Sequence, residues 1–173
     1  MENVIRDLSL APSGRDKIEW VRRNMPLLAG IRRQFQAERP FAGLKVALST
    51  HLEAKTACLC QTLAAGGAEM YVTGSNPLST QDDVAAALAE DGMHVFALHG
   101  ATAEEYAACL RHTVSCRPDI VIDDGGDIVQ TLLTSDPSLS ARVIGGCEET
   151  TTGILRLKGL ERSGRLPFPM IAV

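Results

Sequence analysis

Asp119-Ile120-Val121-Ile122-Asp123-Asp124-Gly125-Gly126-Asp127 is the segment that decides the fold of this 173-residue chain. Its apolar part has the composition of a buried strand, and the end joins three carboxylates to two glycines. In an open parallel sheet the ligand crevice lies beyond the carboxyl ends of the strands, where glycine lets the backbone turn sharply. Taken alone, the segment fits two interpretations: a loop that presents acids to a ligand, or one whose aspartates cap the next helix.

Short apolar runs of the same kind alternate with helical segments along the chain. Strands are predicted at 44–49, 69–73, 94–98, 119–123, 143–145 and 169–173, and helices at 53–65, 80–90, 103–115, 128–134 and 149–162. This alternation predicts an α/β fold with an open, mostly parallel, doubly wound sheet of the Rossmann-like or flavodoxin-like kind, covered by helices on both faces. Hydroxyl residues followed by acids, at 79–82 and 102–105, predict capped helix starts.

A long N-terminal helix is expected before the sheet. We predict an irregular arm over residues 1–13 and one helix over 14–39, in which Pro26 introduces a kink. The chain then divides into this arm and a single α/β domain over 14–173. Because no helix follows the last predicted strand, we expect a fragment of a longer protein or a subunit completed by another chain.

The composition narrows the class of protein. An apolar content of 45% suits one domain with a proper core, while a net charge of −4 without a basic cluster argues against nucleic acid or an acidic membrane surface as the partner. No signal region or membrane-spanning stretch occurs, so a cytoplasmic location is expected. The five cysteines are predicted to be buried thiols rather than metal ligands; they lie at 58, 60, 109, 116 and 147.

Three segments that follow predicted strands should meet at one edge of the sheet: 49–57, 123–127 and 145–153. They bring together His51, several acids and a cluster of hydroxyls, a combination that suits acid/base work on a polyol such as ribose. Each piece also has a local interpretation, since a His before a helix often caps it and a threonine run is often β-prone filler. The chain contains neither a Walker A loop nor GxGxxG, so no complete phosphate or dinucleotide cradle is predicted.

Four segments make the chain recognisable: HLEAKTA at 51–57, TGSNPLSTQDDVAAAL at 73–88, IDDGGD at 122–127 and CEETTTGILRL at 147–157. They closely resemble the N-terminal substrate-binding domain of the adenosylhomocysteinase family, also called S-adenosylhomocysteine hydrolase. The resemblance extends from about residue 8 to the last residue. It implies that 14–173 is a substrate-binding domain.

The resemblance implies an activity and its partners. Family members use NAD to oxidise the ribose 3′-hydroxyl of S-adenosylhomocysteine, which allows elimination of homocysteine, addition of water and return of the nucleoside. The implied partners are S-adenosylhomocysteine, adenosine or inosine, homocysteine and, in the full-length enzyme, further copies of the same chain.

Residue roles are carried over by matching motifs. His51 and Asp124 match the family's acid/base pair, Glu149 matches a catalytic carboxylate that also holds the ribose hydroxyls, and Asp127 is expected to brace its loop. The residues implied to bind substrate are Thr50, Glu53, Lys55, Thr56 and Glu149, and those implied to reach NAD are Thr150, Thr151 and Thr152. No metal is implied.

One departure from the common family pattern concerns the purine. Many members have a Thr and a Glu where this chain has Glu53 and Lys55, as in the branch that carries HLEAKTA. An ammonium group can only donate hydrogen bonds, so Lys55 suits the 6-oxo group of hypoxanthine better than the 6-amino group of adenine. S-inosylhomocysteine is therefore a candidate substrate. The alternative is that Lys55 pairs with Glu53 or points to solvent.

A second departure is length. The family segments that carry further catalytic residues and the NAD domain would follow Val173, so the isolated chain is predicted to be inactive even with NAD added. Three alternatives stay open beside the enzyme: a non-catalytic nucleoside-binding module, a subunit of a split enzyme, and a degraded fold that serves only for interaction.

Overall fold

Six short strands pair into one parallel sheet. In the computed structural model, which describes residues 2–173, they lie in the order β3-β2-β1-β4-β5-β6. Their bounds are β1 Lys45–Thr50, β2 Glu69–Gly74, β3 His94–Val95, β4 Ile120–Asp123, β5 Gly145–Glu148 and β6 Met170–Ala172. Every neighbouring pair is parallel, which confirms the predicted α/β class and makes the sheet more uniformly parallel than predicted.

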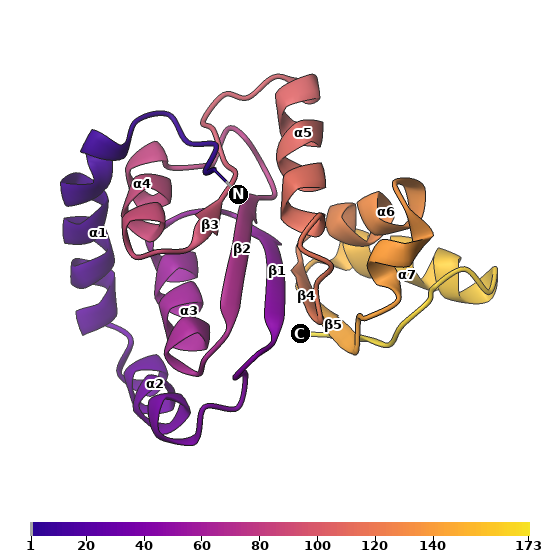
Figure 1. Cartoon of the computed structure of the whole chain (residues 1–173), viewed down its shortest axis with the longest axis horizontal. Helices are drawn as coiled ribbons and strands as arrows, with labels where there is room; N and C mark the ends of the chain where they lie inside the picture. The colour runs from indigo at the N-terminus through magenta and orange to yellow at the C-terminus, as the bar shows by residue number, and fades with distance from the viewer. Residues whose placement is uncertain (1) are drawn as a thin grey trace.

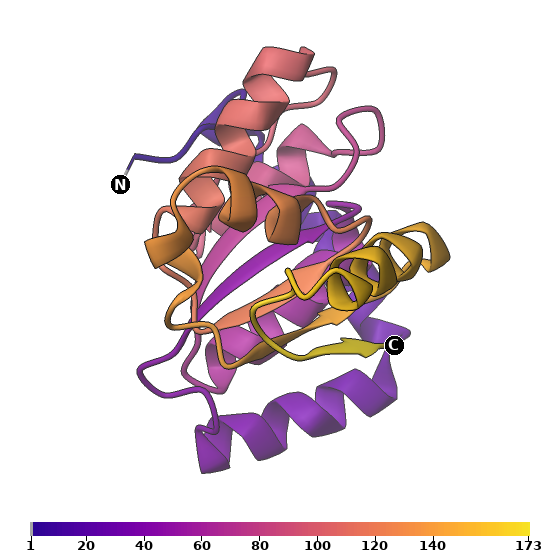
Figure 2. The same cartoon turned by 90° about the vertical axis from the view of Figure 1, so that its right-hand side faces the viewer.

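Helices cover both faces of the sheet. They are α1 Ala11–Arg23, α2 Pro26–Glu38, α3 Ala54–Ala65, α4 Asp82–Glu90, α5 Ala103–Val114, α6 Asp127–Thr134 and α7 Thr151–Arg162, with short 3-10 helices η1 Leu8–Leu10 and η2 Pro137–Ser140. Figure 1 shows α3 and α4 on one side of the strands, with α1 outside them, and α5, α6 and α7 on the other. In Figure 2 the second group faces the viewer.

Successive side chains of β1 pack into separate apolar clusters on the two faces of the sheet. Val46 and Leu48 pack into the apolar cluster beneath α3 and α4, whereas Ala47 packs into the cluster formed with α5, α6 and α7. All three side chains are almost fully buried. Successive residues of a strand point to opposite faces, so a continuously apolar strand is what a sheet covered on both sides requires.

The predicted single helix over 14–39 is two helices, and the first begins earlier, at Ala11. The helical path breaks at Met25, whose backbone lies at φ −122° and ψ 62°. A residue before proline is disfavoured in the α region, and Pro26 then suits the first turn of the next helix. Pro26 thus separates two helices rather than kinking one.

Two strand predictions were misplaced. The fifth strand was predicted at 143–145 but begins at Gly145, because Gly145 and Gly146 lie inside the strand and not in a turn. A Cβ at Gly146 would come within 2.6 Å of both the Val121 carbonyl oxygen and the Met170 sulfur, so the glycine permits close packing of β4, β5 and β6. The strand predicted at 94–98 shortens to two residues, followed by an isolated bridge between Phe96 and Val4.

The two predicted helix caps had different outcomes. Thr102 accepts the Glu105 amide hydrogen while Glu105 accepts that of Thr102, a complete capping box at the start of α5. At α4, the residue in the capping position is Gln81, which makes no side-chain capping bond. The Ser79 hydroxyl, predicted to cap this helix, contacts His51 instead.

The strand order reverses at β1, and this positions the site. The chain moves outward from β1 to β2 and β3, then returns through α5 to β4 on the other side of β1. The connections that follow β1 and β4 therefore run to opposite faces of the sheet, and in open α/β sheets the ligand crevice lies between two such strand ends. The loops that carry His51 and Asp124 begin at these two strand ends.

The contact between α7 and β5 depends on one glycine, and this gives a first prediction. A Cβ added at Gly153 would overlap with the carboxyl group of buried Glu148, whereas one added at Gly159 on the same helix would meet open space. We expect Gly153→Ala to lower the free energy of unfolding by about 2 kcal/mol through overpacking. Gly159→Ala, the matched control, should raise it by up to about 1 kcal/mol through helix propensity.

Urea unfolding followed by circular dichroism measures both changes. Equal stabilities for the two variants would contradict the packing described for Gly153.

Candidate active site

Three loops meet at the carboxyl edge of the sheet. They follow β1, β4 and β5, which are neighbours, and the register places Ser49 beside Asp123 and Asp123 beside Glu148. The residues just beyond these positions, His51, Asp124 and Glu149, are consequently close in space. The structure thus brings together the three segments that the sequence predicted to converge.

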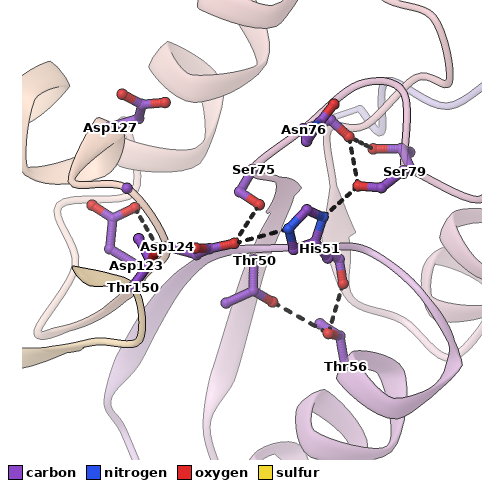
Figure 3. A network of polar contacts seen from close by, with 12 residues as sticks. Thr50, His51, Thr56, Ser75, Asn76, Ser79, Asp123, Asp124, Asp127 and Thr150 are labelled. Atoms are coloured by element: carbon purple, nitrogen blue, oxygen red, sulfur yellow. Dashed lines mark hydrogen bonds and ion pairs between the residues drawn. The ribbon is translucent and has the colours of Figure 1, made fainter. Parts of the chain in front are cut away.

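His51 and Asp124 face each other where the strand order reverses (Figure 3). The Nε2 atom of His51 lies 3.5 Å from Oδ2 of Asp124, and the Ser75 hydroxyl donates to the same carboxylate oxygen over 2.8 Å. The imidazole is 52% exposed and the carboxylate 11% exposed. An accessible imidazole beside a sheltered carboxylate can exchange protons with a ligand in the crevice.

The second nitrogen of His51 contacts a residue that was predicted to cap a helix. Nδ1 lies 2.5 Å from the Ser79 hydroxyl, in the loop between β2 and α4. Sequence reasoning assigned Ser79 to a helix cap and did not single out Ser75. The available signal was position: both follow β2, the strand beside β1, so their loop reaches the same edge of the sheet.

Thr50 and Thr56 brace the turn that carries His51. Their hydroxyls lie 3.3 Å apart, and the Thr56 hydroxyl also donates to the His51 carbonyl oxygen over 2.7 Å. Thr50 is buried, while Thr56 is half-buried. The hydroxyls tie the end of β1 to the start of α3, and their predicted contact with substrate stays a prediction.

Glu53 and Lys55 have separate roles at the start of α3. The Glu53 carboxylate accepts the backbone hydrogens of Lys55 and Thr56 and so caps the helix. The Lys55 side chain is exposed, and no ion pair within residues 2–173 includes it. Of the two local alternatives for Lys55, pairing with Glu53 is wrong and exposure to solvent is what the structure has.

Two buried acids that sequence reasoning missed lie beneath the crevice. Asp123 accepts the backbone hydrogens of Asp124 and Val129, each over 3.1 Å. Glu148 accepts those of Gly125 and Thr150 through Oε1, whereas its Oε2 is buried without a partner among the described residues. Burial raises the pKa of Asp123 to about 7, and the nearby Glu148 carboxyl adds to the rise.

The glycine turn after β4 has the conformation that its sequence suggested. Gly125 and Gly126 have φ values of 116° and 79°, which residues with a side chain rarely adopt. Asp127, the first residue of α6, accepts hydrogen bonds from the Tyr106 hydroxyl over 3.0 Å and from Arg156 over 2.8 Å. It therefore braces the loop, as expected, and is not the cap of the helix.

Glu149 lies at the rim of the crevice with an exposed side chain. Partial loss of hydration raises the pKa of its carboxyl, and the Asp124 carboxylate acts in the same direction, while His51 and Lys55 oppose the rise. These influences place Glu149 within electrostatic reach of three other predicted site residues.

Three threonines open α7 on the same side. The Thr150 amide bonds to Glu148, but its side chain makes no capping bond, and Thr151 and Thr152 are exposed. Among the described residues, none of the three hydroxyls has a hydrogen-bond partner. They are available to donate to a ligand at the helix N-terminus.

No group of three or more His, Cys, Asp or Glu side chains within residues 2–173 is arranged to hold a metal ion. None of the helices described is long and apolar enough to cross a membrane. All five cysteines are free; four are buried, as predicted, whereas Cys147 is half-buried.

Several known proteins have sequences similar to this chain. Residues 2–137 match the family described as S-adenosyl-L-homocysteine hydrolase. The chain is 55% identical over 172 residues to S-inosyl-L-homocysteine hydrolase of Methanopyrus kandleri, covering 99% of this chain and 41% of the relative. It is 51% identical over 173 residues to the protein of that name from Methanococcus maripaludis, covering 100% and 41%. It is 52% identical over 169 residues to adenosylhomocysteinase of Aeropyrum pernix, covering 98% and 41%.

The chain therefore spans about two fifths of the length of these curated relatives.

The buried carboxyl of Asp123 predicts a pH dependence of stability. Its ordinary pKa is 3.8 and its folded pKa about 7, so between these values the native chain binds more protons than the unfolded chain. The free energy of unfolding should therefore fall as pH rises through this window. Asp123→Asn removes the titration and should reduce that slope by up to about 1.4 kcal/mol per pH unit.

Urea unfolding at intervals from about pH 4 to pH 8 measures this slope. Asp136→Asn is the control, because Asp136 is exposed and its pKa is lowered by hydrogen bonds from Ser138. A slope as steep in Asp123→Asn as in the unchanged chain would count against a protonated Asp123.

Proposed function

The chain belongs to the S-adenosyl-L-homocysteine hydrolase family, and we propose that it forms the nucleoside-binding crevice of such an enzyme. The proposed reaction is the reversible hydrolysis of S-adenosylhomocysteine or S-inosylhomocysteine to homocysteine and the nucleoside. The observation that carries this proposal is the contact of His51 with Asp124 at the strand reversal. An imidazole and a carboxylate side by side at such a crevice can move protons at a bound ligand.

The proposed chemistry needs two proton transfers. Eliminating a thiol from the 5′ carbon removes a proton from the 4′ carbon and delivers one to the leaving sulfur, and the addition of water reverses both. We assign these transfers to His51 and Asp124. His51 is exposed enough to reach a ligand, while Asp124 is held by Ser75 and by the glycine turn. Holding the two groups in fixed positions lowers the entropic cost of the transfers.

Glu149 is assigned to the ribose hydroxyls. Its carboxyl stands at the rim and can accept two hydrogen bonds from neighbouring hydroxyls, and partial burial raises its pKa, which makes the carboxylate a better proton acceptor. Its backbone amide bonds to the Asp123 carbonyl oxygen over 3.1 Å, which fixes it relative to the loop of Asp124.

We propose NAD as the cofactor of the complete site. The three unpartnered hydroxyls of 150–152 fit this role, because they can donate to oxygen atoms of a dinucleotide at the N-terminus of α7. NAD, when bound, supplies a hydride acceptor for the ribose 3′ carbon. The chain has no GxGxxG motif, so these threonines would hold only part of the cofactor.

Hypoxanthine is the proposed base. Lys55 has an exposed ammonium group and no ion-pair partner among the described residues, whereas the Glu53 carboxylate is committed to capping α3. A donor without a competing carboxylate favours a 6-oxo over a 6-amino purine. Two of the relatives described above are named for S-inosylhomocysteine, which supports the same choice.

Nucleoside binding tests this proposal directly. We expect the chain to bind inosine at least about tenfold more tightly than adenosine, since a charge-assisted hydrogen bond contributes about 1.5–3 kcal/mol. Lys55→Met should remove the preference. Lys158→Met, an exposed lysine further along α7, should keep it. Calorimetric titration measures all three, and a preference for adenosine in the unchanged chain would refute hypoxanthine as the base.

A turnover assay tests whether this chain alone is sufficient for catalysis. The 173 residues contain no full dinucleotide motif, so we expect no release of homocysteine from either thioether substrate when NAD is added. A thiol-reactive dye follows the release continuously. Release at a rate above that of the His51→Gln variant would show that the chain is sufficient for catalysis.

A further inference from the structure

Each ring nitrogen of His51 has one protein partner. Nε2 faces the Asp124 carboxylate at 3.5 Å, and Nδ1 lies 2.5 Å from the Ser79 hydroxyl (Figure 3). The Asp124 oxygen on this side also accepts from Ser75. The imidazole is therefore held from both sides, by groups on the loops after β4 and β2.

The partners determine where the proton of a neutral imidazole sits. A carboxylate can only accept, so the nitrogen that faces Asp124 is favoured to carry the hydrogen. A neutral imidazole has one N–H, which leaves Nδ1 as an acceptor. Ser79 then has to donate its hydroxyl hydrogen to Nδ1.

The surroundings of Ser79 allow this donation. Its hydroxyl has one other acceptor within reach, the Asn76 carbonyl oxygen at 3.1 Å. That oxygen also lies within 3.2 Å of the backbone nitrogens of Ser79 and Thr80, and 3.1 Å from the Thr80 hydroxyl. A carbonyl oxygen has two lone pairs, so it is satisfied without the Ser79 hydrogen.

The same two acceptors suit a protonated ring. When Nδ1 also carries a hydrogen, it donates to the Ser79 oxygen, and the hydroxyl hydrogen turns toward Asn76. The ring does not need to move, because only the serine hydroxyl rotates. A residue that both donates and accepts is required at this position; alanine can do neither.

We propose that Ser79 is a positioning residue which holds neutral His51 as the Nε2–H tautomer and, by rotating its hydroxyl toward Asn76, keeps the ring in place when a second proton is bound. The inference rests on the proposed function, in which His51 transfers protons from its Nε2 side. A protonated ring gives its Nε2 hydrogen to the leaving group and keeps Nδ1–H on Ser79. The neutral ring left by that transfer is the Nδ1–H form, and it regains a proton at Nε2 in the next transfer. The Nε2–H tautomer is thus the neutral form of the ligand-free chain, before the second proton binds.

Nitrogen NMR of the ligand-free chain tests the tautomer. The chain is labelled with ¹⁵N-histidine and studied at alkaline pH, where an imidazole ordinarily carries one hydrogen. We expect the hydrogen of His51 on Nε2. His99 is the internal contrast: its Nδ1 lies 2.9 Å from the Thr80 carbonyl oxygen, so its hydrogen should be on Nδ1. Assignment uses His51→Gln and His99→Gln.

Variants of the serine separate positioning from a general structural role. Ser79→Ala should shift the Nδ1 resonance of His51 and admit the second tautomer, while Ser79→Thr, which keeps the hydroxyl, should restore the original spectrum. Ser75→Ala, which removes a contact of Asp124 only, should leave the Nδ1 resonance in place. Backbone amide spectra verify that each variant is folded.

Two results would overturn the proposal: a neutral His51 with its hydrogen on Nδ1, or a Ser79→Ala spectrum in which the His51 resonances are those of the unchanged chain. Neither measurement involves a nucleoside. A chain that binds no nucleoside would refute the proposed function and leave this result standing, so the two failures are distinguishable.

Discussion

The pairing of β1 with β4 is the constraint on which the site depends. In this pair Ser49 lies beside Asp123, and both strands stop within two residues of the side chains that face each other above. Because the chain leaves β1 in one direction and returns on its other side, no connection crosses the gap between the two strand ends. A slip of the register by one residue would turn the strand's side chains to the opposite face and separate His51 from Asp124.

Two buried carboxyl groups hold the loops that follow this pair of strands in place. Asp123 and Glu148 are register partners, and between them they accept four backbone hydrogens, three from the loops of the site and one from Val129 in α6. Burying an acid without a cation is unfavourable, and the raised pKa of Asp123 reflects this cost. In return, these hydrogen bonds hold the backbones of the loops after β4 and β5 and leave the side chains at the edge of the sheet free to contact a ligand. Gly153 and Gly146 complete the arrangement by leaving room for Glu148 and for close strand packing.

Overall sequence identity identifies the family of the chain, whereas the choice of purine depends on individual polar groups. The chain has similar identity to two relatives named for S-inosylhomocysteine and to one named adenosylhomocysteinase, so identity establishes the family and not the base. In the proposed function, the choice between purines rests on a few polar groups, chiefly Lys55 at the start of α3. Such groups decide specificity because a buried polar atom that loses its partner is costly.

The sequence by itself determined the class of fold, the order of its elements and the edge of the sheet at which the site would form. These follow from local properties: the alternation of apolar runs with helical periods, and the glycines that must turn after Asp124. It misplaced the start of β5 and the break at Pro26, where glycine and proline each permit more than one backbone path. Only the tertiary structure decided that Ser79 bonds to His51, that Asp123 and Glu148 hold the loops, and that Asp127 meets Tyr106 and Arg156. The bonds of Ser79 to His51, of Gly125 to Glu148 and of Asp127 to Tyr106 and Arg156 join residues 21 to 29 positions apart. A hydroxyl or a carboxylate can bond to any donor within reach, and strand order decides which donors those are.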